Sequence, residues 1–81
     1  MNVMYFAWVR ERIGVPSEQL ETTAVTVSDL VAELSAKDER YAVAFADVSA
    51  LRVALDQELS RFDAPIAGVQ EIAFFPPMTG G

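Results

Sequence analysis

The amino-acid sequence predicts a small α+β domain with a mixed β-sheet. Strand-like apolar runs lie near both ends of the chain, at 3–9 and 71–75, and residues 51–56 alternate between apolar and polar side chains. Between these regions, after Thr26, apolar residues recur at helical spacing. The chain has 81 residues, of which 52% are hydrophobic and 22% charged, so it suits one folded domain and is too apolar for intrinsic disorder.

The first two predicted elements are strands. Residues 3–9 are rich in aromatic and branched side chains, and the charged residues 10–12 close this run. A turn follows at 14–17, which contains a glycine and a proline. The segment 18–22 has few apolar residues, as is typical of an edge strand, so we expect it to form a hairpin with the first strand.

A helix is predicted over residues 27–36. Thr26 and Asp29 have the spacing of a capping box, and the apolar positions that follow have helical periodicity, at Leu30, Val31 and Leu34. Lys37, the only lysine, lies near the end of this helix, where the helix dipole favours a cation.

A second, shorter helix and three further strands complete the prediction. The helix spans 40–46, where Tyr41 and Phe45 are four residues apart and share a face. The strands are expected at 51–55, at 59–62 and at 71–75, with residues 63–65 breaking the pattern after the second of them. Two prolines then end the last strand, because proline cannot donate a ladder hydrogen bond.

The composition removes most catalytic chemistry. The chain has no cysteine and no histidine, which excludes a thiolate metal site, a cysteine nucleophile and a Ser-His arrangement. The acidic pairs Asp56/Glu58 and Asp38/Glu39 are interpreted as solvated surface groups, because unpaired acidic side chains are mostly exposed. We therefore expect no self-contained active site, no metal and no cofactor bound by this chain.

Charge and hydropathy limit the partners. Six Lys and Arg against twelve Asp and Glu give a net charge of −6, the wrong sign for binding nucleic-acid phosphates or an anionic membrane. The longest apolar run, at 3–9, is far shorter than the roughly 20 residues that cross a bilayer. We expect a cytoplasmic protein with basic or apolar protein partners, and neither nucleic acid nor membrane among them.

The last six residues have the most unusual composition. They contain four of the eight glycines and prolines, so the strand at 71–75 leads into Pro76 and Pro77 and then to Gly80 and Gly81. Six extended residues reach about 20 Å, enough to carry the terminal carboxylate into a pocket of a partner. Glycine lacks a Cβ and fits a narrow channel. A Gly-Gly end alone is also compatible with a frayed terminus of no function.

The reactive group of such a tail is its α-carboxylate. A carboxylate is ionised at pH 7 and is a poor electrophile until it is activated. Adenylation of Gly81 by a partner would activate it, and the acyl-adenylate could then accept sulfur to give a thiocarboxylate or an amine to give an amide. Neither product requires a cysteine or a histidine in this chain, so the sequence predicts a carrier.

Residues 71–81 closely resemble the C-terminus of the small subunit of molybdopterin synthase. The segments 6–11, 26–34 and 53–58 resemble the same family, so the resemblance spans essentially the whole chain. There are two departures. The family more often has asparagine at the position of Asp56, and the turn at 67–70 lacks the acidic-Gly-acidic pattern common in the family, which leaves the geometry of this turn open.

The resemblance implies a ubiquitin-like β-grasp domain over 1–75, in which a mixed sheet packs on one main helix, and a flexible extended tail over 76–81. It also implies a sulfur carrier in molybdenum cofactor biosynthesis. An E1-like enzyme would adenylate Gly81 with ATP and magnesium, and a sulfurtransferase or cysteine desulfurase would supply the sulfur. The tail would then insert into the large synthase subunit of a heterotetramer and donate sulfur to cyclic pyranopterin monophosphate. The catalytic side chains would belong to that subunit.

The resemblance also assigns residues to the partner interface. Gly81 would carry the thiocarboxylate, and the residues that precede it would line the mouth of the partner's pocket: Phe75, Pro76, Pro77, Met78, Thr79 and Gly80. Phe75 is equally compatible with the core of the domain. Three alternatives stay open: a ubiquitin-like modifier that joins Gly81 to lysines of targets, a sulfur carrier for thiamine synthesis or transfer-RNA thiolation, and a binding module whose tail is inert.

Overall fold

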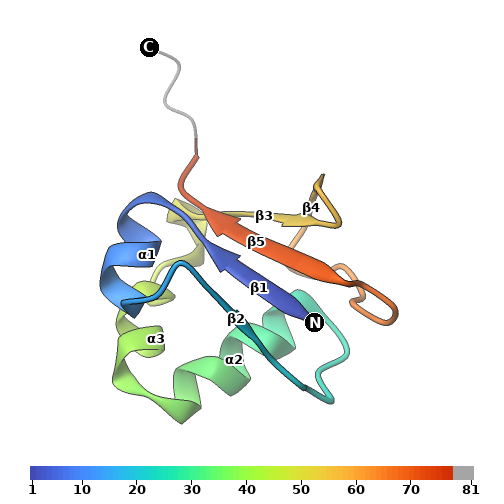
Figure 1. The fold of residues 1–81 in the computed structure, drawn as a ribbon, viewed down its shortest axis with the longest axis horizontal. Helices are drawn as coiled ribbons and strands as arrows, with labels where there is room; N and C mark the ends of the chain where they lie inside the picture. Colours follow the sequence, from blue (N-terminus) through green and yellow to red (C-terminus); the bar gives the residue numbers. More distant parts are fainter. Residues whose placement is uncertain (78–81) are drawn as a thin grey trace.

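The computed structural model describes residues 1–77, which fold around a five-stranded mixed sheet of order β2-β1-β5-β3-β4 (Figure 1). The strands are β1 (Asn2–Tyr5), β2 (Ser17–Gln19), β3 (Arg52–Leu55), β4 (Glu58–Ser60) and β5 (Glu71–Phe75). β1 and β5 are parallel neighbours at the centre, and the other neighbouring pairs are antiparallel. This is the ubiquitin-like β-grasp, and it confirms the predicted α+β class and mixed sheet.

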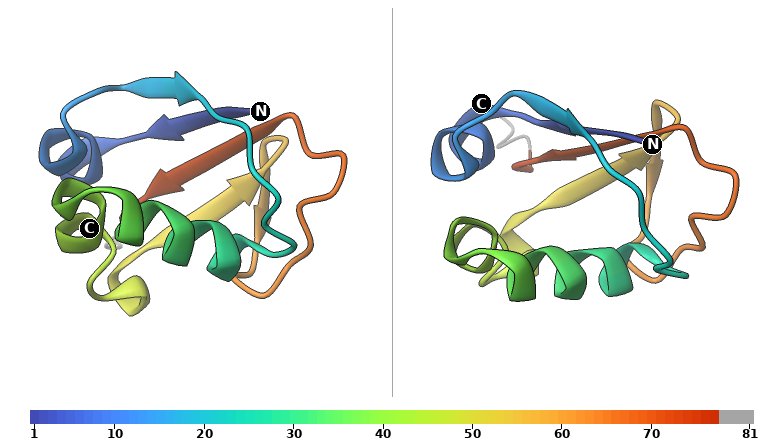
Figure 2. Two further views of the ribbon diagram at one scale, coloured as in Figure 1. Left: turned by 90° about the horizontal axis from the view of Figure 1, so that it is seen from below. Right: turned by 60° about the horizontal axis from the view of Figure 1, so that its bottom comes forward.

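The helical elements are α1 (Ala7–Ile13), α2 (Val27–Lys37), α3 (Glu39–Ala44) and a 3₁₀ turn, η1 (Val48–Ala50). α2 and α3 lie on one side of the sheet, and within residues 1–77 no helix covers the other side (Figure 2). The core fills the space between the helices and the sheet, and its largest fully buried side chains include Tyr5, Phe74, Leu30 and Leu51.

The predicted first strand is wrong beyond Tyr5, because α1 begins at Ala7. Ala7 has a positive φ of 54°, which turns the chain out of the strand direction. Val9 and Ile13, four residues apart, are then buried together, and Gly14 ends the helix with a φ of 97° while its N–H donates to the Arg10 carbonyl.

Because α1 separates the first two strands, they do not form the expected hairpin. β2 still pairs antiparallel with β1, as predicted, but it spans Ser17–Gln19 instead of 18–22. The 3₁₀ turn η1 was not predicted either.

Most other elements lie close to the positions predicted from the sequence. Thr26 and Asp29 form the predicted capping box, and the helix they start ends at Lys37, one residue later than expected. α3 and β3 lie within a residue or two of their predicted bounds, and β5 has the bounds predicted. β4 spans Glu58–Ser60, so the strand expected at 59–62 ends earlier.

The turn between β3 and β4 fastens the loop that precedes β5. Asp56 and Gln57, the two residues of this turn, both have positive φ, 49° and 71°, as a type I′ hairpin turn requires. The Asp56 carboxylate accepts hydrogen bonds from the backbone N–H groups of Gln70 and Glu71, each 3.0 Å long. Gly68 has a φ of 78° in the loop. Asp56 thus has a structural role, which its interpretation as a merely solvated acid did not include.

Candidate functional site

The end of β5 is anchored by Phe74. This side chain is fully buried, and its ring packs edge-on against Phe45 at a centroid distance of 5.0 Å. Tyr5 stacks on it at 6.3 Å and Phe62 lies at 6.3 Å. Burying a phenylalanine contributes about 1.5–3 kcal/mol to folding, so the last residues of β5 are held by the core of the domain.

Phe75 points to the other face of the sheet, because side chains alternate along a strand. It is half-buried, pairs with Arg52 of β3, and leads into the half-buried Pro76 and Pro77. The chain leaves β5 at the end of the sheet where α1 follows β1 and β3 begins (Figure 1). The other tail residues assigned from the sequence, Met78, Thr79, Gly80 and Gly81, lie outside the described residues, as does the predicted flexibility of the tail.

An apolar row crosses the open face of the sheet next to Phe75. The cross-strand registers place Met4, Ala73, Ala54 and Leu59 side by side on this face, and we call these four residues the apolar row. Leu59 is 70% exposed although it lies on a strand, whereas the other three are half-buried. The amino-acid sequence alone does not reveal this row, because recognising it requires the register of four strands.

Phe6 adds a further exposed aromatic side chain at the tail end of the sheet. Its N–H donates to the Phe74 carbonyl at 3.1 Å, which extends the pairing of β1 with β5 by one residue. The side chain is 42% exposed. Phe6 is separated from Leu59 by β5 and β3 in the sheet, so we do not count it as part of the apolar row.

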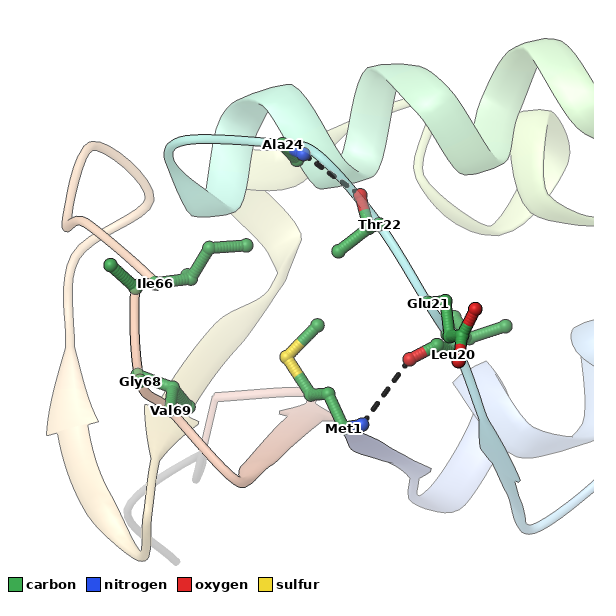
Figure 3. A pocket seen from close by; sticks show the side chains of 9 residues that line it. Met1, Leu20, Glu21, Thr22, Ala24, Ile66, Gly68 and Val69 are labelled. Carbon is green, nitrogen blue, oxygen red and sulfur yellow. Dashed lines mark hydrogen bonds between the residues drawn. The ribbon is translucent and has the colours of Figure 1, made fainter.

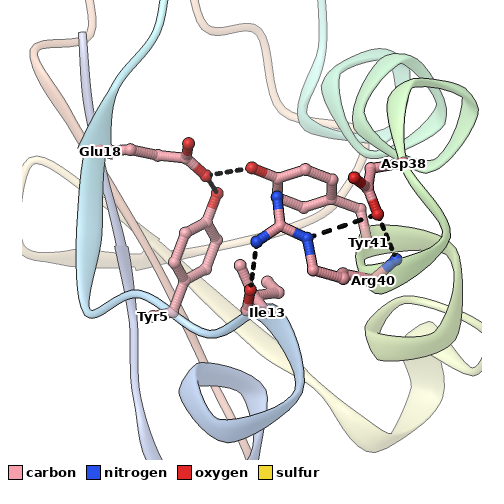
Figure 4. Close-up of polar contacts among 6 residues, drawn as sticks. All are labelled: Tyr5, Ile13, Glu18, Asp38, Arg40 and Tyr41. Carbon is pink, nitrogen blue, oxygen red and sulfur yellow. Dashed lines mark hydrogen bonds and ion pairs between the residues drawn. The ribbon is translucent and has the colours of Figure 1, made fainter.

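Beneath this end of the sheet, a polar cluster ties β1, β2, α1 and α3 together (Figure 4). The Glu18 carboxylate accepts hydrogen bonds from the hydroxyls of Tyr5 and Tyr41. Burial, together with the bond to Glu18, raises the pKa of Tyr41 to about 12 and raises the pKa of Tyr5 as well. Both hydroxyls therefore stay protonated at neutral pH and act as structural donors.

Arg40 extends the same cluster to α1. Its guanidinium donates to the Ile13 carbonyl at 3.1 Å and pairs with the Asp38 carboxylate at 3.3 Å. Asp38 also accepts a hydrogen bond from the Arg40 backbone N–H, and this bond, with the charge of Arg40, lowers the pKa of Asp38. The other predicted surface acid of this pair, Glu39, is exposed.

The opposite end of the sheet carries an open cavity of about 330 Å³. It lies between the segment after β2 and the loop before β5, and the Met1 ammonium donates to the Leu20 carbonyl beside it at 3.2 Å (Figure 3). Because β1 and β5 are parallel and both begin here, the cavity is at the far end of the sheet from the tail.

Residues 1–77 lack two features that would point to other functions. No three histidine, cysteine, aspartate or glutamate side chains gather there in a way that could hold a metal ion. None of the helices described has the length and apolar composition needed to cross a membrane.

Comparison with known proteins gives a match over nearly the whole sequence. A family model described as the ThiS family matches residues 3–81. Two curated relatives, from Escherichia coli K12 and Haemophilus influenzae Rd, are 38% and 40% identical over 81 residues. The alignments cover 100% of this chain and 99% of each relative, and both relatives are named molybdopterin synthase sulfur carrier subunit.

Solved structures match the fold over the same range. SAMP1 from Haloferax volcanii has a TM-score of 0.77 at 22% identity, covering 100% of this chain and 98% of that chain. A putative molybdopterin converting factor, subunit 1, from Pyrococcus furiosus has a TM-score of 0.70 at 22% identity, covering 95% of each chain. At these identities the likeness establishes the fold alone.

Proposed function

The chain belongs to the ThiS family and to the family of the molybdopterin synthase sulfur carrier subunits, and from this premise we propose that it carries sulfur for molybdopterin synthesis on its terminal glycine. The observation that carries the proposal is the fixed position of β5. The buried Phe74 anchors this strand at the centre of the sheet, and the segment that ends in Gly80 and Gly81 continues directly from it.

The chemistry takes place in two steps at the terminal carboxylate. An E1-like enzyme binds ATP and magnesium, the Gly81 carboxylate oxygen attacks the α-phosphorus, and pyrophosphate leaves. A sulfur donor, either a sulfurtransferase or a cysteine desulfurase, then presents a persulfide whose terminal sulfur attacks the Gly81 carbonyl carbon, and AMP leaves. A second thiol cleaves the resulting acyl disulfide by forming a disulfide with the donor, and a thiocarboxylate remains on Gly81. The thiocarboxylate transfers its sulfur to cyclic pyranopterin monophosphate within the large subunit of the synthase.

The large subunit is proposed to bind the open face of the sheet beside the tail. The apolar row and Phe75 form a continuous apolar surface that leads to Pro76 and Pro77. Contact with this surface would bury Leu59 and bring Met78, Thr79 and Gly80 to the mouth of the partner's pocket. The core below stays intact, because its residues face the helices.

Mass spectrometry of the protein isolated from its own cells tests the carrier function. We expect a population in which one sulfur replaces one oxygen at Gly81, and loss of sulfur transfer to the precursor when Gly81 is deleted. The deletion variant should unfold at the wild-type temperature, because the described core ends at Phe74. A deletion variant that still transfers sulfur would contradict the proposal.

Paired substitutions test the docking surface. Leu59→Asp should weaken binding of the large subunit at least about ten-fold, which corresponds to about 1.4 kcal/mol, because it places a charge in an apolar contact. Val25→Asp is the matched control, since Val25 is 67% exposed but lies before α2 and outside the apolar row. Equal binding by the two variants in titration calorimetry would argue against this surface.

The same experiments separate the alternatives. Gly81 joined to lysines of other proteins would indicate a modifier, and a thiocarboxylate that does not react with the pterin precursor would indicate a carrier for thiamine synthesis or transfer-RNA thiolation. An unmodified tail that can be removed without effect would indicate a binding module whose tail is inert.

A further inference from the structure

Activation of Gly81 creates an electrophile that any accessible amine can attack, and this chain contains very few amines. Lys37 is the only lysine, and the other five basic side chains are arginines, whose guanidinium groups stay protonated and do not act as nucleophiles. Met1 contributes an α-amine as well. Among residues 1–81, these two nitrogen atoms are the amines that can attack an activated tail.

The structure distinguishes these two amines. The Met1 amine is part-buried and donates to the Leu20 carbonyl at 3.2 Å, at the end of the sheet far from the tail. Lys37 is exposed in the last turn of α2, and among residues 1–77 its ammonium has no ion-pair partner. Its neighbour Asp38 is already engaged, since it caps α3 and pairs with Arg40.

Lys37 lies on a different side of the domain from the apolar row, the surface proposed to bind the large subunit. α2 lies on the helical side of the sheet, whereas the apolar row lies on the open face (Figure 2). A second copy attached at Lys37 therefore does not cover the apolar row of the first.

We propose that Lys37 is the acceptor for the activated Gly81 of a second copy, so that the protein joins to itself through a single isopeptide linkage. The neutral Lys37 amine attacks the Gly81 carbonyl carbon of the acyl-adenylate, a C–N bond forms, and the bond from that carbon to the phosphate oxygen breaks. AMP leaves, and the amine proton passes to water. The inference rests on the proposed adenylation, and sulfur transfer competes with it for the same intermediate.

The test uses the full chain with its adenylating enzyme, ATP and magnesium, without a sulfur donor. Release of pyrophosphate reports adenylation, and intact mass with peptide mapping reports the product. We expect a covalent dimer whose only cross-link joins Gly81 to Lys37, and loss of this dimer when the sulfur donor is added. Lys37→Arg keeps the cation at the end of α2, so it should fold and release pyrophosphate normally but form no dimer.

The outcomes separate this inference from the proposed function. Pyrophosphate release without a dimer, a dimer that persists in Lys37→Arg, a link to Met1, or a cyclic monomer overturns the Lys37 assignment and leaves the carrier function standing. No pyrophosphate release overturns both.

Discussion

Substitution of Asp56 tests how the turn before β5 is held. The carboxylate of Asp56 accepts two backbone hydrogen bonds of 3.0 Å from Gln70 and Glu71, and its own N–H donates to the Glu71 carbonyl at 2.8 Å. The substitution Asp56→Ala removes the first two bonds and keeps the third. It also places an alanine at a φ of 49°, a region that aspartate and asparagine tolerate better than alanine does.

The expected cost of Asp56→Ala has two parts. A hydrogen bond contributes about 0.5–1.5 kcal/mol net, and because these bonds are exposed we expect the two together to contribute about 1–2 kcal/mol. The positive φ adds about 1 kcal/mol for alanine. The total of about 2–3 kcal/mol should lower Tm by roughly 10–20 °C for a domain of this size.

Two further variants separate these parts. Asp56→Gly loses the bonds but accepts the positive φ, so it should cost only about 1–2 kcal/mol. Asp56→Asn keeps an acceptor oxygen and tolerates the same φ, so it should cost less than about 1 kcal/mol. Urea and thermal unfolding measure all three. If Asp56→Ala and Asp56→Gly both unfold like the wild type, the turn does not fasten the loop and our reasoning is wrong.

Substitutions at three other positions test the polar cluster and the helix ends. Because the pKa of Tyr41 is raised from 10.0 to about 12, the folded protein keeps the hydroxyl proton between these pH values, whereas the unfolded chain loses it. The contribution of this hydroxyl to the free energy of unfolding is therefore fully present below pH 10 and should fall as pH rises towards 12. Tyr41→Phe should reduce this slope in urea unfolding at alkaline pH, and an unchanged slope would rule out the hydroxyl bond to Glu18 as its source. Thr26→Ala should cost about 1 kcal/mol because it removes the cap that the Asp29 N–H requires, whereas Thr26→Ser should cost little; equal Tm values for the two would contradict the cap. Gly14→Ala should cost about 1–2 kcal/mol through its φ of 97° alone, since its Cβ would find ordinary space, and a neutral effect on Tm would show that the end of α1 can rearrange.

Sequence periodicity predicted the elements whose patterns are local. The capping box and apolar positions of α2 set its start, and the two prolines set the end of β5, so both were placed within a residue. α1 was missed because the aromatic and branched side chains of Phe6, Trp8 and Val9 are typical of strands. Burial of Val9 and packing against α3 and β5 override that preference. The available signal was Gly14 followed by Pro16, a common way to end a helix.

The candidate site could be predicted only in part, for a similar reason. Both alternating sets of β5 are apolar, Ile72 with Phe74 and Ala73 with Phe75, so the sequence could not decide which set faces the core. The registers decide it, because Ile72 and Phe74 lie beside the buried residues of β1 and β3. The exposure of Leu59 likewise depends on the pairing of β4, which local periodicity does not contain.

The parallel pairing of β1 with β5 also orders events during synthesis. β1 leaves the ribosome well before its central partner β5, which is made about 70 residues later, so this central pair cannot form until residues 71–75 have emerged. A chain that stops before Phe74 lacks the residue that fills the centre of its core. Such a chain would not fold stably and would be degraded by proteases. Folding itself would therefore remove carriers that stop before the base of the tail, whereas carriers that lack only residues of the tail would still fold.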